Sequence, residues 1–112
     1  MAENKLADMS TEFAVEILNL TDGIKGHYSL SNQLERSGTS IGANIREAFY
    51  AHGKADFIAK LQIALKECSE TEYWIELILE SGYYYDKTLL DKCTEIKRIL
   101  IASINTAKEN PK

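Results

Sequence analysis

The apolar residues of this chain recur every three or four positions in four separate segments, which is the spacing of one face of an α-helix. The segments cover residues 4–24, 30–51, 54–81 and 87–108. Gly, Ser or Asp residues stand between them, where helices commonly begin or end. Because the breaks are short, consecutive helices are expected to run antiparallel. The pattern predicts an all-α, up-down-up-down four-helix bundle.

The third segment has the most regular spacing of the four. Its core stripe advances in steps of four and three and comprises Phe57, Leu61, Ala64, Cys68, Thr71, Ile75 and Ile78. A sustained step of this kind favours a shallow crossing of about 20° between helices. We therefore expect an antiparallel left-handed four-helix bundle that forms one domain over residues 1–112.

The same segment carries a second apolar stripe on the side opposite its core. With Phe57 at zero and about 100° per residue, this stripe falls near 200° to 260°. Its members are Ala59, Ile63, Trp74 and Leu77. Scattered surface apolar residues are common, whereas an exposed aromatic patch is typical of a contact with another protein. The second stripe favours a subunit interface and a homo-oligomer.

Charge is unevenly distributed along the chain. Residues 25–66 contain six bases and three acids, and residues 67–86 contain six acids and no base. Two interpretations remain open: a solvated acidic face, or a head-to-tail contact between the basic region of one subunit and the acidic region of the next. Glu72 falls on the core side, where a buried carboxylate needs a partner. The candidates by residue type are Arg36, Arg46 and Asn44, and a water-exposed carboxylate is the alternative.

The second segment contains a run of small residues, from Ser37 to Ala43, with two glycines four positions apart. Glycine inside a helix costs about 1 kcal/mol relative to alanine. The run therefore indicates that another helix approaches closely at this point. It has neither the preceding strand nor the Gly-Lys-Ser ending of a phosphate-binding loop. The residues assigned to close helix packing are Ser37, Gly38, Ile41, Gly42 and Asn44.

The composition of the 112-residue chain narrows the range of possible functions. The formal net charge of −4 disfavours a dedicated nucleic-acid binder, which needs clustered Lys and Arg. Residues 1–5 show no signal peptide, and no apolar run is long enough to span a bilayer, so a cytoplasmic protein without membrane contact is expected. A bundle metal site needs Glu-x-x-His pairs, and none occurs.

No catalytic, metal-binding or cofactor-binding residue is therefore expected, and we predict no enzyme. His27 and His52 do not have the spacing of a helical metal site. Cys68 and Cys93 sit on core stripes, about 13 residues before one helix end and about 6 after the next helix start. At 1.5 Å per residue their heights should differ by about 10 Å, too far for a disulfide.

Two stretches resemble a known family. The first is Gln33-Leu34-x-Arg36-Ser37-x-x-Ser40-Ile41-x-Ala43-Asn44-Ile45-x-Glu47, and the second runs from Phe57 through Ala64-Leu65-Lys66-Glu67 to Trp74. Together they resemble the signatures of the 23S ribosomal RNA intervening-sequence proteins, also called the four-helix bundle protein family. Gly42 departs from the pattern because many relatives have proline there, and Gly53 replaces a common serine cap.

The resemblance implies a left-handed bundle and, in several members, a ring-shaped homopentamer. It also implies that the matched residues Asn44, Glu47, Glu70 and Trp74 are structural or interfacial. The predicted interface is thus Ala59, Ile63, Glu70, Trp74 and Leu77. Some members are encoded inside insertions in 23S ribosomal RNA genes. A distantly related group, the basic accessory proteins of diversity-generating retroelements, is thought to bind nucleic acid and a reverse transcriptase.

Two functions follow as hypotheses. The first is an oligomeric scaffold or adaptor that binds another protein through the second stripe and the acidic third segment. The alternative is an RNA- or DNA-associated accessory protein. Its candidate contacts are Lys25, Arg36, Arg46, Lys54 and Lys60.

Overall fold

The computed structural model describes residues 2–84 and 86–110, with side chains from residue 5 onward. Of the predicted domain, Met1, Tyr85, Pro111 and Lys112 lie outside these ranges. The chain forms the helices α1 (Ala2–Gly23), α2 (Tyr28–Phe49), α3 (Lys54–Ser81) and α4 (Thr88–Glu109). The predicted all-α fold of four helices is confirmed.

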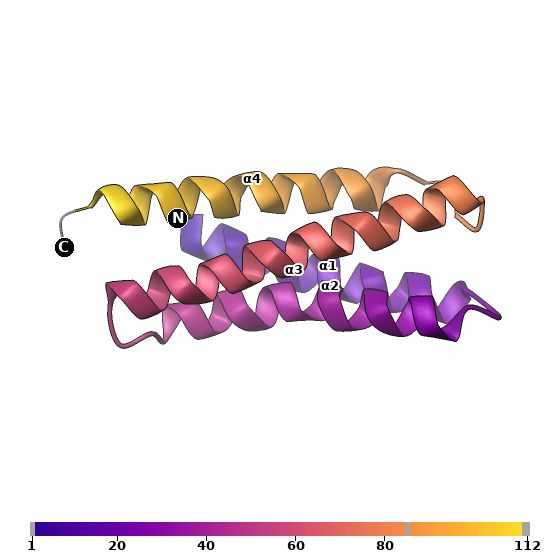
Figure 1. The fold of residues 1–112 in the computed structure, drawn as a ribbon, viewed down its shortest axis with the longest axis horizontal. Helices are drawn as coiled ribbons and strands as arrows, with labels where there is room; N and C mark the ends of the chain where they lie inside the picture. Colours follow the sequence, from indigo (N-terminus) through magenta and orange to yellow (C-terminus); the bar gives the residue numbers. More distant parts are fainter. Residues whose placement is uncertain (1, 85, 111–112) are drawn as a thin grey trace.

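The helices lie side by side in a body of 49 × 20 × 19 Å, and each runs opposite to its neighbours (Figure 1). The α1–α2 and α3–α4 connections lie at one end, and the α2–α3 connection lies at the other. α2 packs between α1 and α3, and α4 packs between α3 and α1, so the four helices close a ring around one core. The left-handed twist stays a prediction.

Two local features fix the end of the bundle that holds two connections. α3 stops at Gly82, whose φ of +84° is a left-handed conformation that favours glycine. His27, directly before α2, stacks on Tyr83 with ring centroids 4.2 Å apart. The ring contact ties the α1–α2 connection to the residues that follow α3.

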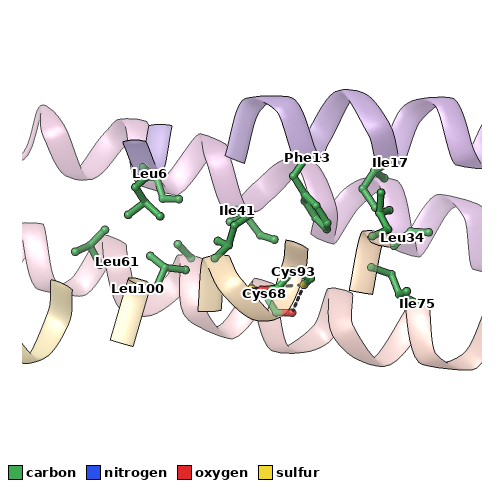
Figure 2. Close-up of a cluster of buried hydrophobic side chains, with 14 of the residues drawn as sticks. Leu6, Phe13, Ile17, Leu34, Ile41, Leu61, Cys68, Ile75, Cys93 and Leu100 are labelled. Carbon is green, nitrogen blue, oxygen red and sulfur yellow. Dashed lines mark hydrogen bonds between the residues drawn. The ribbon is translucent and has the colours of Figure 1, made fainter. Parts of the chain in front are cut away.

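The core stripe of α3 lies at the centre of the bundle. Its six residues from Leu61 to Ile78 are buried, and only Phe57 near the helix start is partly exposed. They meet large side chains of the other three helices, among them Phe13, Ile17, Leu34, Ile41 and Leu100 (Figure 2). Full burial of an aliphatic side chain contributes about 1.5–3 kcal/mol, so this contact is the main source of stability.

The contact between α1 and α2 depends on small side chains. A Cβ atom added to Gly38 would lie 3.1 Å from Cγ1 of Ile17, and one added to Gly42 would lie 3.2 Å from Oγ of Ser10. The approach explains why Ser10 is buried although it is polar. Its hydroxyl donates to the carbonyl of Ala7 in its own helix.

The other small residues of the run have separate positions. Ser37 is buried on the α3 side, where its Oγ accepts a 2.9 Å hydrogen bond from Thr71. Ile41 is fully buried in the core. Asn44 is half-buried and donates to the carbonyl of Ser40. The run therefore serves two neighbouring helices, α1 through its glycines and α3 through Ser37.

The tight contact at Gly38 yields a stability prediction. Gly38→Val places methyl groups against Ile17 and should lower the free energy of unfolding by about 1–3 kcal/mol, the usual cost of overpacking. Gly23→Val is the matched control, because a Cβ at Gly23 meets no atom within 4 Å. Urea unfolding followed by circular dichroism measures both. Equal midpoints for the two variants would contradict a close α1–α2 approach.

Candidate interaction surface on α3

The second apolar stripe lies on the side of α3 that faces away from the core. We use the term outward stripe for Ala59, Ile63, Glu70, Tyr73, Trp74 and Leu77. Ile63 is 41% exposed, Leu77 is 40% exposed and Ala59 is exposed. Trp74 is partly buried against the core, so it lies at the edge of the stripe. The structure thus brings the predicted interface residues together on one face of one helix.

Tyr73 belongs to this surface although the sequence analysis omitted it. Its side chain is 55% exposed, and its ring lies 5.1 Å from the Trp74 ring, centroid to centroid. On the helical wheel Tyr73 falls at about 160°, just outside the 200° to 260° sector of the other residues. A wider sector would have included it.

Glu70 holds Trp74 in place. The indole Nε1 of Trp74 donates a 3.1 Å hydrogen bond to the Glu70 carboxylate, which also accepts a bond from the Arg36 guanidinium of α2. Arg36 forms a second ion pair with Glu67, at 3.2 Å. The Arg36 hydrogen bond, followed by that of Trp74, lowers the pKa of Glu70 below its usual value. The group therefore stays ionised and keeps the indole orientation at neutral pH.

The partner of Glu72 differs from all three sequence candidates. Its carboxylate accepts a 2.9 Å bond from Nζ of Lys97 and a 3.0 Å bond from Thr94, both on α4. The prediction of Arg36, Arg46 or Asn44 is wrong because those residues lie on α2, whereas Glu72 points to the α4 side of α3. The bond to Glu72 raises the pKa of Lys97.

The five basic residues proposed for nucleic-acid contact do not form one patch. Arg36 pairs with Glu67 and Glu70, Lys60 lies 3.5 Å from Glu47, and Lys54 donates to the carbonyl of Asn110. Lys25 lies in the α1–α2 connection, at the end opposite to Lys54.

Arg46 is exposed near the end of α2, about 27 Å along the axis from the start of that helix. Lys25 and Arg46 are thus far apart. The charge density of a phosphate-binding surface is missing over the described part of this region.

The prediction that Cys68 and Cys93 lie at different heights is wrong. Their Sγ atoms are 3.6 Å apart, and both residues are fully buried. The expected difference in height holds only if α4 starts at the level where α3 stops. Instead α4 begins well short of that level (Figure 1). Cys93 lies five residues after the start of α4, and Cys68 lies 13 residues before the end of α3. Because α4 starts short of the end of α3, the two cysteines lie at the same height along the bundle.

A hollow of about 490 Å³ lies between α1 and α2. It is lined mainly by small side chains: Ser10, Thr11, Ala14, Thr39, Gly42 and Ala43, with Arg46 and Glu47 at one end. Val15 and Leu18 of α1 are 52% and 44% exposed. The bundle thus has large exposed apolar groups on α3 and a shallow, small-residue surface between α1 and α2.

The described residues contain neither a metal-binding cluster nor a membrane-spanning helix. Among them, no group of three or more His, Cys, Asp or Glu side chains could hold a metal ion. Within the same ranges, no helix combines the length and apolar character required to cross a bilayer.

The Glu70 network yields a pH prediction. Because the folded pKa of Glu70 is lowered, its bonds persist below pH 4.5 and are lost as pH falls further, through the folded pKa. Trp74 is the single tryptophan, so its fluorescence reports the loss directly. The emission midpoint should lie below pH 4.5, in the range where circular dichroism is unchanged.

Arg36→Gln should move this midpoint up towards 4.5, since Arg36 is the main cause of the lowered pKa. Lys92→Gln is the control, because Lys92 pairs with Glu16 and has no bond to this network. A midpoint that is the same in wild type and Arg36→Gln would contradict the assignment.

Comparisons with known proteins agree with the geometry. The model of the family described as 23S rRNA-intervening sequence protein matches residues 2–102. A similar solved structure is a protein of unknown function from the S23 ribosomal protein family of Bacteroides thetaiotaomicron. It is 47% identical, with a TM-score of 0.88, and the match covers 94% of this chain and 99% of that one. No match was found among curated proteins. The chain belongs to the 23S rRNA-intervening sequence protein family.

Proposed function

We propose that this protein is a non-enzymatic, homo-oligomeric scaffold whose subunits meet through the outward stripe of α3. One observation carries the proposal: Ile63, Tyr73 and Leu77 are 40% to 55% exposed on one helix face, beside a tryptophan fixed by Glu70. Exposed apolar patches rimmed by polar groups are typical of protein contacts, and aromatic residues are enriched in their centres.

The size of the outward stripe limits how it can be used. From Ala59 to Leu77 the helix rises about 27 Å, and a helix is about 10 Å wide, so the projected area is about 270 Å². A stable interface usually buries about 800 Å² on each partner. The stripe alone is too small, and a stable oligomer needs either flanking surface or a second contact.

A second surface is available on α1. Val15 and Leu18 are exposed there, next to the small-residue hollow between α1 and α2. Large groups of one subunit, such as Trp74 and Leu77, fit a surface of small groups on the next. Such a contact joins two different patches, so it is head-to-tail and closes into a ring when the rotation allows. The family resemblance favours five subunits.

The acidic and basic regions contribute less to this contact than the sequence suggested. Arg36 and Lys97 are already paired with glutamates of α3 inside the subunit. Their charges are largely neutralised by ion pairs within one chain. The apolar surfaces are therefore the main source of association energy. A second protein partner of the scaffold stays a hypothesis.

The nucleic-acid alternative has less support. Three of its five candidate side chains are engaged within the subunit, and Lys25 and Arg46 are distant from each other. If binding depended on two phosphate contacts, the logarithm of the binding constant would fall with the logarithm of the salt concentration with a slope of about −2. So few contacts are too weak to retain nucleic acid firmly at physiological salt.

The oligomer is tested by native mass spectrometry of the purified chain. Wild type should give a mass several times that of one subunit, and Trp74→Ala or Ile63→Asp should shift it towards the monomer, because each removes or charges the apolar contact. Ile101→Asp is the matched control, since Ile101 is 40% exposed on α4 and belongs to neither surface. A monomeric wild type would refute the proposal, and co-purifying nucleic acid would favour the alternative.

A mixing experiment separates a head-to-tail contact from a symmetric one. Ile63→Asp and Val15→Asp each retain one intact surface, so an equimolar mixture should form one-to-one dimers while each variant alone stays monomeric. If α3 packs symmetrically on α3 of the next subunit, Val15→Asp alone should still dimerise.

A further inference from the structure

Cys68 of α3 and Cys93 of α4 meet in the centre of the core (Figure 2). Both are free thiols with 0% exposure. The two cysteines belong to different helices and are separated by 25 positions in the sequence. The proposed scaffold function does not use this pair, because the outward stripe lies on the opposite side of α3.

The contacts around the two thiols are reciprocal. The Sγ atoms are 3.6 Å apart, Sγ of Cys68 lies 3.3 Å from the Cys93 carbonyl oxygen, and Sγ of Cys93 lies 3.5 Å from the Cys68 carbonyl oxygen. A thiol can reach the opposite backbone in both directions only where the helices approach closely. A disulfide requires this proximity, with Cα atoms within about 7 Å and an S–S bond of about 2.0 Å.

We propose that Cys68 and Cys93 are a disulfide-forming site that links α3 to α4 inside the folded subunit when a peroxide oxidises the pair. The sulfur atoms need to approach by about 1.5 Å, which small side-chain rotations and a slight helix shift supply. Neither side chain has an exposed position from which it could pair with another subunit.

The reaction balances with hydrogen peroxide as the oxidant. One thiolate attacks a peroxide oxygen, the O–O bond breaks, and a sulfenic acid and hydroxide form. The second thiolate then attacks the sulfenic sulfur, the S–S bond forms, and the S–O bond breaks with release of hydroxide. The hydroxides take up the two thiol protons, so two thiols and one peroxide give one disulfide and two waters.

The reduced pair is the resting form. The hydrogen bond with Cys68 and burial raise the pKa of the Cys93 thiol far above its usual value, so thiolate is scarce at neutral pH. Oxidation therefore proceeds slowly and through brief openings of the α3–α4 contact. Once formed, the bond closes a loop of about 25 residues, and it should raise the unfolding temperature by roughly 10 °C or more.

The test exposes the native protein to hydrogen peroxide and follows its intact mass. The expected product has lost two hydrogen atoms, and peptide mapping without reductant joins the Cys68 peptide to the Cys93 peptide within one chain. The unfolding temperature should rise and return after treatment with dithiothreitol. Subunit number should stay unchanged, so this result is independent of the oligomer experiment.

Cys68→Ala and Cys93→Ala are the controls, and neither should lose two hydrogens or gain thermal stability. Since either variant creates a small core cavity, the wild-type mass is the decisive measurement. The proposal is overturned if native wild type keeps both thiols under conditions that link them in the urea-unfolded chain. Sulfinic acid without a link, or a disulfide between subunits, would also overturn it.

Discussion

The burial of α3 between α2 and α4 determines most of the structure. Six successive core-stripe residues, from Leu61 to Ile78, are excluded from solvent, and this leaves the helix only one rotation about its axis. Every other position on α3 follows from that rotation. Glu72 must point to α4, Glu67 and Glu70 must point to α2, and Ile63, Tyr73 and Leu77 must face water. The exposed surface is thus a consequence of the core packing.

The fold was predictable because apolar periodicity reports which side of each helix is buried. The predicted helix limits lie within two residues of those in the structure, and six of the seven predicted stripe residues of α3 are buried, with Phe57 partly exposed. Buried polar residues were harder to predict. Ser10 and Thr21 of α1 are buried because α2 offers little side-chain volume and Glu35 accepts the Thr21 hydroxyl, and neither reason is local to α1.

The candidate surface was predicted in part, and the failures have different causes. Periodicity fixes rotation about a helix axis but says nothing about the displacement of one helix along another. The cysteine pair was missed because α4 starts short of the end of α3. The partner of Glu72 was missed because residue type does not reveal that this carboxylate faces α4 and not α2. Tyr73 was omitted only because the chosen sector was narrow.

The arrangement of the connections has a consequence for any assembly built from this subunit. Two connections, with the His27–Tyr83 stack, lie at one end of the bundle, and the α2–α3 connection lies at the other. In a cyclic assembly every copy presents the same end to the same side. A ring of these bundles therefore has two different rims, one formed by the α1–α2 and α3–α4 connections and one formed by the α2–α3 connection with the first turn of α3. A molecule that recognises one rim would bind the ring from a single side.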